Sequence, residues 1–138
     1  MSTPASDIPQ GFKPSGFKGI YLSKVGPYFV KPEDGTLKVG LRIDANHINY
    51  VDIAHGGVLT TLADVTLSLQ VHRAEDPPLN VTTVSLTSNF LGPAKLGDWL
   101  VGEGRIDRIG KKIAYTSGRI LCGDKAIMTM SGVFNIMR

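Results

Sequence analysis

Residues 49–68 read Asn49-Tyr-Val-Asp-Ile-Ala-His55-Gly56-Gly57-Val-Leu-Thr-Thr-Leu-Ala-Asp64-Val-Thr-Leu-Ser68, a polar stretch that leads into an apolar one. The two glycines open a predicted helix, so bare backbone N–H groups and the positive end of the helix dipole can approach a ligand. Asp64 lies two turns further along. A carboxylate there can attack, or activate water against, a carbonyl that those N–H groups polarise. The stretch therefore predicts an acyl-transfer site.

The apolar positions of this stretch predict a helix from about residue 57 to residue 74. They fall at the i, i+3 and i+4 spacing of a buried helix face, and they are Val58, Leu59, Leu62, Val65 and Leu69. Asp64 lies on the opposite, polar side, where a lone carboxylate is most often simply solvated. The joint spacing of Asn49, His55, the glycines and Asp64 is what favours chemistry over that simpler interpretation.

Two blocks of the chain carry a family resemblance. In the first, five residues separate Asn49 from His55-Gly56-Gly57, and Leu62-Ala63-Asp64 follows. The second block, residues 83–94, ends in Asn-Phe-Leu-Gly-Pro-Ala. Together they resemble the hot-dog-fold acyl-CoA thioesterases of the phenylacetate-pathway and 4-hydroxybenzoyl-CoA type. The resemblance covers roughly residues 26–136 and implies hydrolysis of an acyl-CoA to a free acid and coenzyme A.

The chain departs from the pattern of this family at two positions. Asp52 stands where the family often has Gly, three residues before the His, and Asp tolerates the left-handed backbone better than most residues. Ser85 stands where the family strand often carries Asp, so no role is assigned to that position. Neither departure affects Gly56 or Asp64.

The resemblance also implies roles for individual residues. The Gly56 N–H would donate to the thioester carbonyl oxygen, and Asp64 of the facing subunit would act as nucleophile or general base. Asn49 would orient the thioester, His55 would hold the loop or a water, and Thr83 would position the water or the carboxylate. Gly57, Ser68 and Phe90 complete the expected substrate contacts. Four cations at strand ends and turns are expected to contact the coenzyme A phosphates: Lys95, Arg108, Lys111 and Lys112.

The rest of the chain predicts one α+β domain in which an antiparallel sheet wraps the helix, the hot-dog fold. A loose arm over residues 1–16 precedes the single domain, 17–138. A hairpin over residues 28–43 turns at Pro32-Glu33-Asp34-Gly35. Four strands are expected after the helix, at roughly 80–91, 98–108, 112–122 and 125–136. His47 and His72 are expected to be surface residues.

Composition limits the partners. The 138 residues carry a net charge of +3 and a single cysteine, Cys122, so no internal disulfide is possible and a reducing cytoplasm is expected. Basic residues are dispersed, which argues against nucleic acid as a partner. No apolar run has the length of a membrane span, and no metal or other cofactor is expected. The expected assembly is a homodimer as the minimal active unit, paired again into a homotetramer.

Two alternatives stay open from the sequence. A hot-dog enoyl-CoA hydratase needs an Asp and a His placed together, and Asp64 and His55 do not share a helix face. A non-catalytic acyl-CoA sensor would gain nothing from a buried carboxylate. The acyl group itself, aryl or medium-chain, also stays open.

Overall fold

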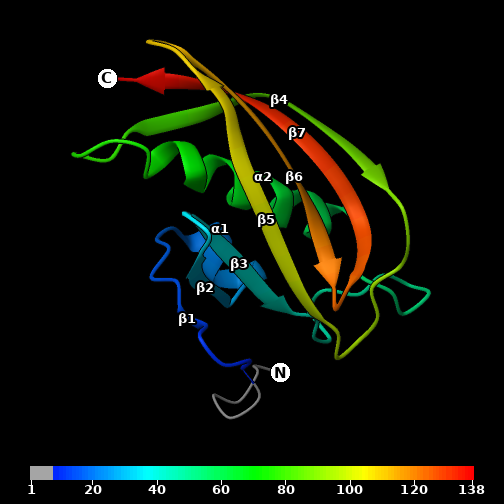
Figure 1. Ribbon diagram of the computed structural model, residues 1–138. Helices are drawn as coiled ribbons and strands as arrows, with labels where there is room; N and C mark the ends of the chain where they lie inside the picture. Colours follow the sequence, from blue (N-terminus) through cyan, green and yellow to red (C-terminus); the bar gives the residue numbers. More distant parts are fainter. Residues whose placement is uncertain (1–7) are drawn as a thin grey trace.

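One long helix, α2 (Gly56–His72), lies at the centre of the protein. The computed structural model describes residues 8–138. A seven-stranded antiparallel sheet curves around α2, with the strands in the order β1-β2-β3-β5-β6-β7-β4 (Figure 1). Its strands are β1 (Lys13–Pro14), β2 (Tyr28–Glu33), β3 (Thr36–Arg42), β4 (Asn80–Phe90), β5 (Trp99–Ile109), β6 (Ile113–Cys122) and β7 (Lys125–Met137). The predicted α+β hot-dog architecture is confirmed.

The buried face of α2 differs from the predicted one. Val58 and Leu69 are only partly buried, whereas Thr66 and Gln70 are buried. Thr66 faces Gly102 of β5, where a Cβ atom would overlap the threonine hydroxyl. The Gln70 amide oxygen accepts a hydrogen bond from the Leu37 N–H at 3.2 Å, and the Gln70 amide nitrogen donates one to the Leu37 carbonyl at 2.8 Å. The spacing of apolar residues did not predict this face, because two of its residues are polar. Thr66 is buried against a glycine of the sheet, and Gln70 is buried with its amide fully hydrogen bonded.

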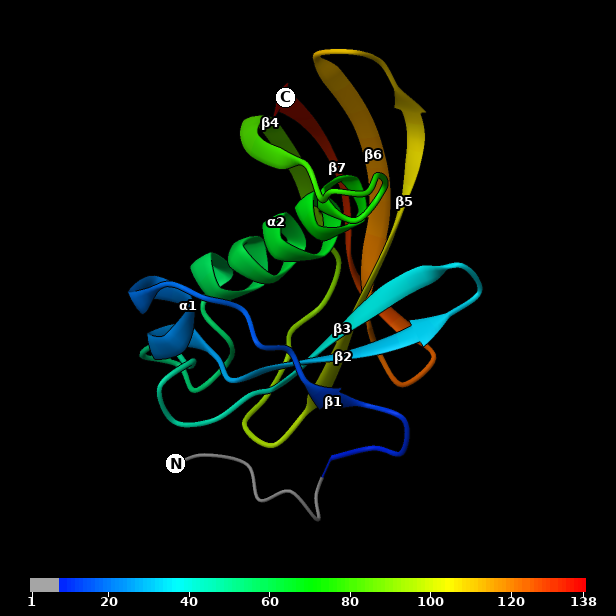
Figure 2. The ribbon, with the colours of Figure 1, turned by 90° about the vertical axis from the view of Figure 1, so that its left-hand side faces the viewer.

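The N-terminal segment contains structure that the sequence did not predict. A short helix, α1 (Ile20–Val25), lies beside the first turns of α2 (Figure 2). Within the expected arm, β1 pairs with β2, and the Phe12 ring stacks edge-on against Trp99 at a centroid distance of 5.2 Å. Residues 1–7 lie outside the described part, so the arm over residues 1–16 and the boundary at residue 17 stay predictions.

Strand β4 forms one edge of the sheet, and it pairs with β7 on one side only. The pairing register shifts between Thr83 and Ser85, which marks a β-bulge at Val84. Regular alternation would put Thr83 on the same face as Ser85 and Thr87. The bulge instead turns Thr83 toward α2, so regular alternation of the two faces of this strand begins only after the bulge.

Helices in residues 8–138 are all too short or too polar to cross a membrane. Over the same residues, His, Cys, Asp and Glu form no group of three that could hold a metal ion.

Candidate active site

The loop before α2 is organised by the side chain of Asn49. Its Oδ1 atom accepts hydrogen bonds from the backbone N–H groups of Val51, at 3.0 Å, and Ile53, at 3.3 Å. Asp52 adopts the left-handed conformation, with φ at 63°, so Asp supplies the backbone geometry for which the family often has glycine. The Asn49 amide nitrogen has no hydrogen-bond partner among residues 8–138, which leaves a donor for a substrate.

The buried His47 ring joins the loop before α2 to the end of α1. Its side chain is buried, with 1% of its surface exposed, so the prediction of a surface residue was wrong. The Nδ1 atom accepts from the Asp44 N–H at 2.9 Å, and Nε2 therefore carries the proton that it donates to the Val25 carbonyl at 2.6 Å. The ring fixes the end of α1 to the loop. His72 is exposed as predicted.

The first turn of α2 uses all but one of its free backbone N–H groups. His55 caps the helix, and its Nδ1 accepts from the Gly57 N–H at 2.8 Å. The His55 carbonyl accepts from Val58 at 2.9 Å and from Leu59 at 3.3 Å. Within the described chain, only the Gly56 N–H of this turn has no acceptor. The structure thus leaves one donor at the positive end of the helix dipole.

Phe90 and Lys95 lie beside this helix start. A methyl group on Gly56 would sit 3.6 Å from Cε1 of Phe90, so the ring flanks the unpaired N–H group. Lys95 forms a β-bridge with Ile53 of the loop. The Phe90 ring therefore borders the place where a carbonyl would meet Gly56, and the backbone of Lys95 pairs with the loop just before it.

Asp64 and Thr83 are in direct contact. The Thr83 hydroxyl donates to Oδ1 of Asp64 at 2.6 Å. Asp64 is half-buried rather than fully solvated. Asp64 lies eight positions after Gly56 on the same helix, a rise of about 12 Å at 1.5 Å per residue. One chain therefore cannot bring both groups to the same carbonyl.

The remaining predicted residues fall into two other places. Ser68 lines a groove along the second half of α2. Arg108, Lys111 and Lys112 line one hollow of about 540 Å³ at the β5–β6 turn, together with Tyr115. Figure 1 shows this turn and the loop before α2 at opposite ends of the sheet. Three of the four predicted phosphate contacts are thus together, and Lys95 is apart from them.

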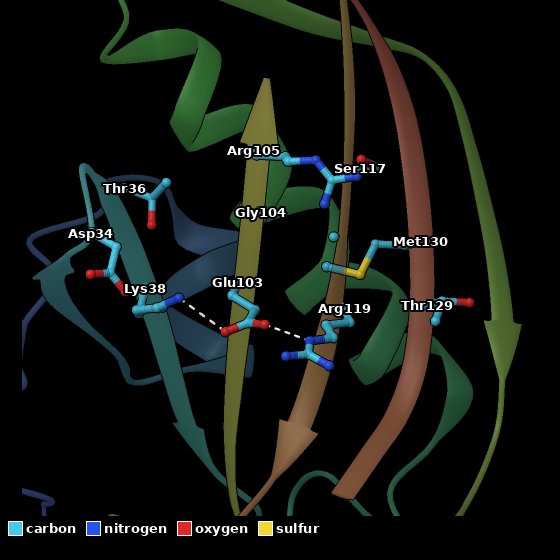
Figure 3. Close-up of a pocket in the computed structure, with 11 residues that line it drawn as sticks. Asp34, Thr36, Lys38, Glu103, Gly104, Arg105, Ser117, Arg119, Thr129 and Met130 are labelled. Carbon is cyan, nitrogen blue, oxygen red and sulfur yellow. Dashed lines mark hydrogen bonds and ion pairs between the residues drawn. The ribbon is translucent and has the colours of Figure 1, made fainter. Parts of the chain in front are cut away.

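A further hollow, of about 430 Å³, lies over strands β3, β5 and β6 (Figure 3). Glu103 at its centre accepts from Lys38 at 2.9 Å and from Arg119. The three charged groups are cross-strand neighbours that satisfy one another, as is typical of sheet stabilisation. Sequence reasoning did not identify this network, because the pairing register of the strands brings its members together.

A comparison with known families assigns the chain. The model of the Thioesterase superfamily matches residues 52–128, more than half of the chain, including Gly56, Asp64 and Thr83. The chain belongs to the Thioesterase superfamily.

Individual relatives agree with membership of the Thioesterase superfamily. The chain is 38% identical over 131 residues to PA0474 of Pseudomonas aeruginosa, whose name proposes an esterase, covering 94% of this chain and 98% of that one. It is 29% identical over 106 residues to acyl-coenzyme A thioesterase 13 of Mus musculus, covering 77% and 73%. The solved structure of BH2602 from Bacillus halodurans, which contains CoA, matches with a TM-score of 0.71 and 25% identity over 78% of this chain and 71% of that one.

Proposed function

We propose that the protein hydrolyses acyl-CoA thioesters at a site shared by two copies of the chain. The observation that carries this proposal is the unpaired Gly56 N–H at the start of α2. A donor held there by the fold stabilises negative charge on a thioester oxygen without reorganisation. The relative named acyl-coenzyme A thioesterase 13 and the CoA in the structure of BH2602 support the substrate class.

In the proposed mechanism, the thioester carbonyl oxygen accepts from Gly56, and the Asn49 amide nitrogen orients the thioester. Asp64 attacks the carbonyl carbon and forms a mixed anhydride that water then hydrolyses, or it takes a proton from a water that attacks the carbonyl carbon itself. In both routes the C–S bond breaks, and the coenzyme A thiolate takes up the proton released from that water. Thr83 holds the carboxylate, and His55 holds the loop. The hydratase alternative gains no support, because Nδ1 of His55 is engaged in capping the helix.

The spacing along α2 supports a second copy of the chain as the source of the carboxylate. Gly56 and Asp64 of one chain are about 12 Å apart. Strand β4 leaves one edge unpaired, and Val84, Phe90 and Leu91 on or just after it are exposed, with 55–59% of each residue's surface accessible. Two β4 edges paired about a two-fold axis would place the partner's Gly56 near Asp64 of this chain. A homodimer is therefore the proposed active unit, and a homotetramer its further assembly.

The proposed pairing of the β4 edges of two chains also supports the proposed contacts with the coenzyme A phosphates. Asn80 at the start of β4 pairs with Met137, and the Arg138 side chain donates to the Lys111 carbonyl. The hollow at the β5–β6 turn therefore lies at the β4 end that would approach the partner's α2 start. The cations of this hollow would bind the phosphates of the coenzyme A whose thioester carbonyl lies at the partner's Gly56, not at Gly56 of their own chain.

Replacing Gly56 tests the donor directly. Proline is well tolerated at the first position of a helix, and His55 already has the extended conformation that a following proline requires, with φ at −61° and ψ at 138°. Gly56→Pro removes the N–H and should lower kcat on the best acyl-CoA by about 10²–10³-fold. Gly56→Ala keeps the N–H and has room beside Phe90, so it should lower kcat far less. Equal loss in both variants would contradict the proposal.

Mixing inactive chains tests the shared site. Chains carrying Gly56→Pro and chains carrying Asp64→Asn should each be inactive alone. After unfolding and refolding together, random pairing should restore about a quarter of wild-type turnover, because half of the dimers contain one intact site. A site contained in one chain would give no recovery.

A further inference from the structure

A groove of about 880 Å³ runs along the exposed face of the second half of α2. Val65, Leu69 and His72 form its floor. The N-terminal segment, residues 15–22, forms one wall, and the start of β4 forms the other. The groove is separate from the hollow at the β5–β6 turn and from the hollow on Glu103.

The groove begins next to the proposed carboxylate. Ser68 lines it and lies one helical turn beyond Asp64. From Asp64 to His72 the helix advances by about 12 Å. A group attached to a carbonyl at Asp64 would therefore enter the groove at Ser68 and follow the helix axis.

Half of the fourteen residues that line the groove are aliphatic or Met, and five are polar: Ser15, Lys18, Ser68, His72 and Asn80. Leu22, Val30 and Leu37 face it from the side of α1, β2 and β3, and Val81 faces it from β4. Leu22 and Val30 also pack against the core. Among the residues that line the groove, only Phe17 carries a phenyl or indole ring.

The wall and the far end of the groove are held in place. The Tyr21 hydroxyl is hydrogen bonded to the Thr61 hydroxyl at 2.7 Å, which fixes α1 to α2. At the far end, Nδ1 of His72 is bonded to the Leu79 carbonyl at 2.7 Å, and Met137 lies beside it. These two hydrogen bonds hold α1 and the far end of the groove in place.

We infer that this groove binds the acyl chain of the substrate, and that the chain is a linear aliphatic group of medium length rather than an aryl group. The inference rests on the proposed function, because it takes the carbonyl to lie at Asp64. An aryl ring spans about one helical turn, the distance from Ser68 to His72, and would leave the aliphatic side chains of Leu22, Val30 and Leu37 on the wall of the groove uncovered.

Binding of non-hydrolysable S-alkyl-coenzyme A thioethers tests the inference without relying on catalysis. Affinity, measured by calorimetry from S-propyl to S-dodecyl, should rise about fourfold for each CH₂. The rise should stop once the chain end passes His72. S-benzyl-coenzyme A should bind more weakly than the best alkyl thioether. Affinity that does not change with chain length, or an S-benzyl preference, would overturn the inference.

Two variants with opposite expected effects locate the chain. Leu69→Trp should block the groove halfway, so that the longer thioethers lose at least tenfold in affinity while S-propyl affinity stays the same. Met137→Ala should extend the far end and shift the plateau to longer chains. Equal losses for short and long thioethers in Leu69→Trp, with no shift of the plateau in Met137→Ala, would overturn the inference. If no thioester releases thiol but this binding pattern holds, the proposed hydrolysis is wrong and the groove assignment stands.

Discussion

The Thr83 hydroxyl donates a hydrogen bond of 2.6 Å to Oδ1 of Asp64, and this contact joins the edge strand β4 to the central helix. It depends on the bulge at Val84, which turns Thr83 toward α2. Hydrogen bonds to a charged acceptor are among the stronger ones in proteins. Thr83 therefore fixes the orientation of the carboxylate, while the second carboxylate oxygen stays available for a substrate or water.

Thr83→Val keeps the shape of the side chain and removes the hydroxyl. We expect kcat to fall about tenfold, in line with the loss of one hydrogen bond to a charged group, while KM changes little. Thr83→Ser retains the hydroxyl and should recover most of the turnover. Steady-state kinetics of both variants check this prediction. A purely structural role for Thr83 would instead lower the melting temperature of Thr83→Val and leave kcat intact.

Lys111 and Lys112 are expected to bind coenzyme A phosphates from the hollow at the β5–β6 turn. Replacing both with Ala should raise KM and leave kcat unchanged, the pattern of lost ground-state binding. KM of the wild-type protein should also rise with salt, because exposed charges are screened within about 8–10 Å at physiological ionic strength. Lys13→Ala, at an exposed lysine on β1, is the control. An unchanged KM in the double variant would move the phosphate site elsewhere.

Glu103 should make stability depend on acid pH. Burial works to raise the pKa of its carboxyl, but hydrogen bonds from Arg119 and Lys38 outweigh it and hold the pKa below the usual 4.5. Because the folded-state pKa is the lower one, the stabilisation is complete above the unfolded-state value and is lost as pH falls through the folded-state value. Thermal unfolding of Glu103→Gln should therefore depend less on pH below about 4.5 than that of the wild type.

Asp107→Asn provides the control for Glu103. Asp107 lies on the same strand and pairs with Arg105, but both side chains are well exposed, so the pair should contribute little. A pH dependence that is the same in Glu103→Gln and in the wild type would show that the Lys38–Glu103–Arg119 network does not set the acid stability.

The sequence predicted those elements whose signal lies in their own residues. Helix α2 and strands β4 to β7 have strong periodicity and turn residues at their ends, and their bounds agree with prediction to within two residues at each end. Helix α1 was missed because its six residues make fewer than two helical turns, too few for a periodic pattern, and none of them is fully buried. The pairing of β1 with β2 was missed because β1 is only two residues long, too short to show the alternation of a strand.

Within the site, the sequence predicted positions better than contacts. Gly56, Asp64 and Thr83 were chosen by resemblance, and the bulge that brings Thr83 to Asp64 has no signature in the alternation of β4. Burial of His47 depends on the Val25 carbonyl, which the chain brings to it from 22 residues away. Such long-range partners cannot be inferred from local spacing.

The measurement that most directly tests the central claim is turnover of Asp64→Asn on the best acyl-CoA, with the melting temperature taken on the same sample. The substitution keeps the size of the side chain and an oxygen that can accept from Thr83, so the fold should survive. If Asp64 is nucleophile or general base, turnover should fall by about 10²–10⁴-fold, about 3–5 kcal/mol of barrier. A folded Asp64→Asn that keeps more than roughly a tenth of wild-type turnover, a loss below about 1.4 kcal/mol, would contradict the account.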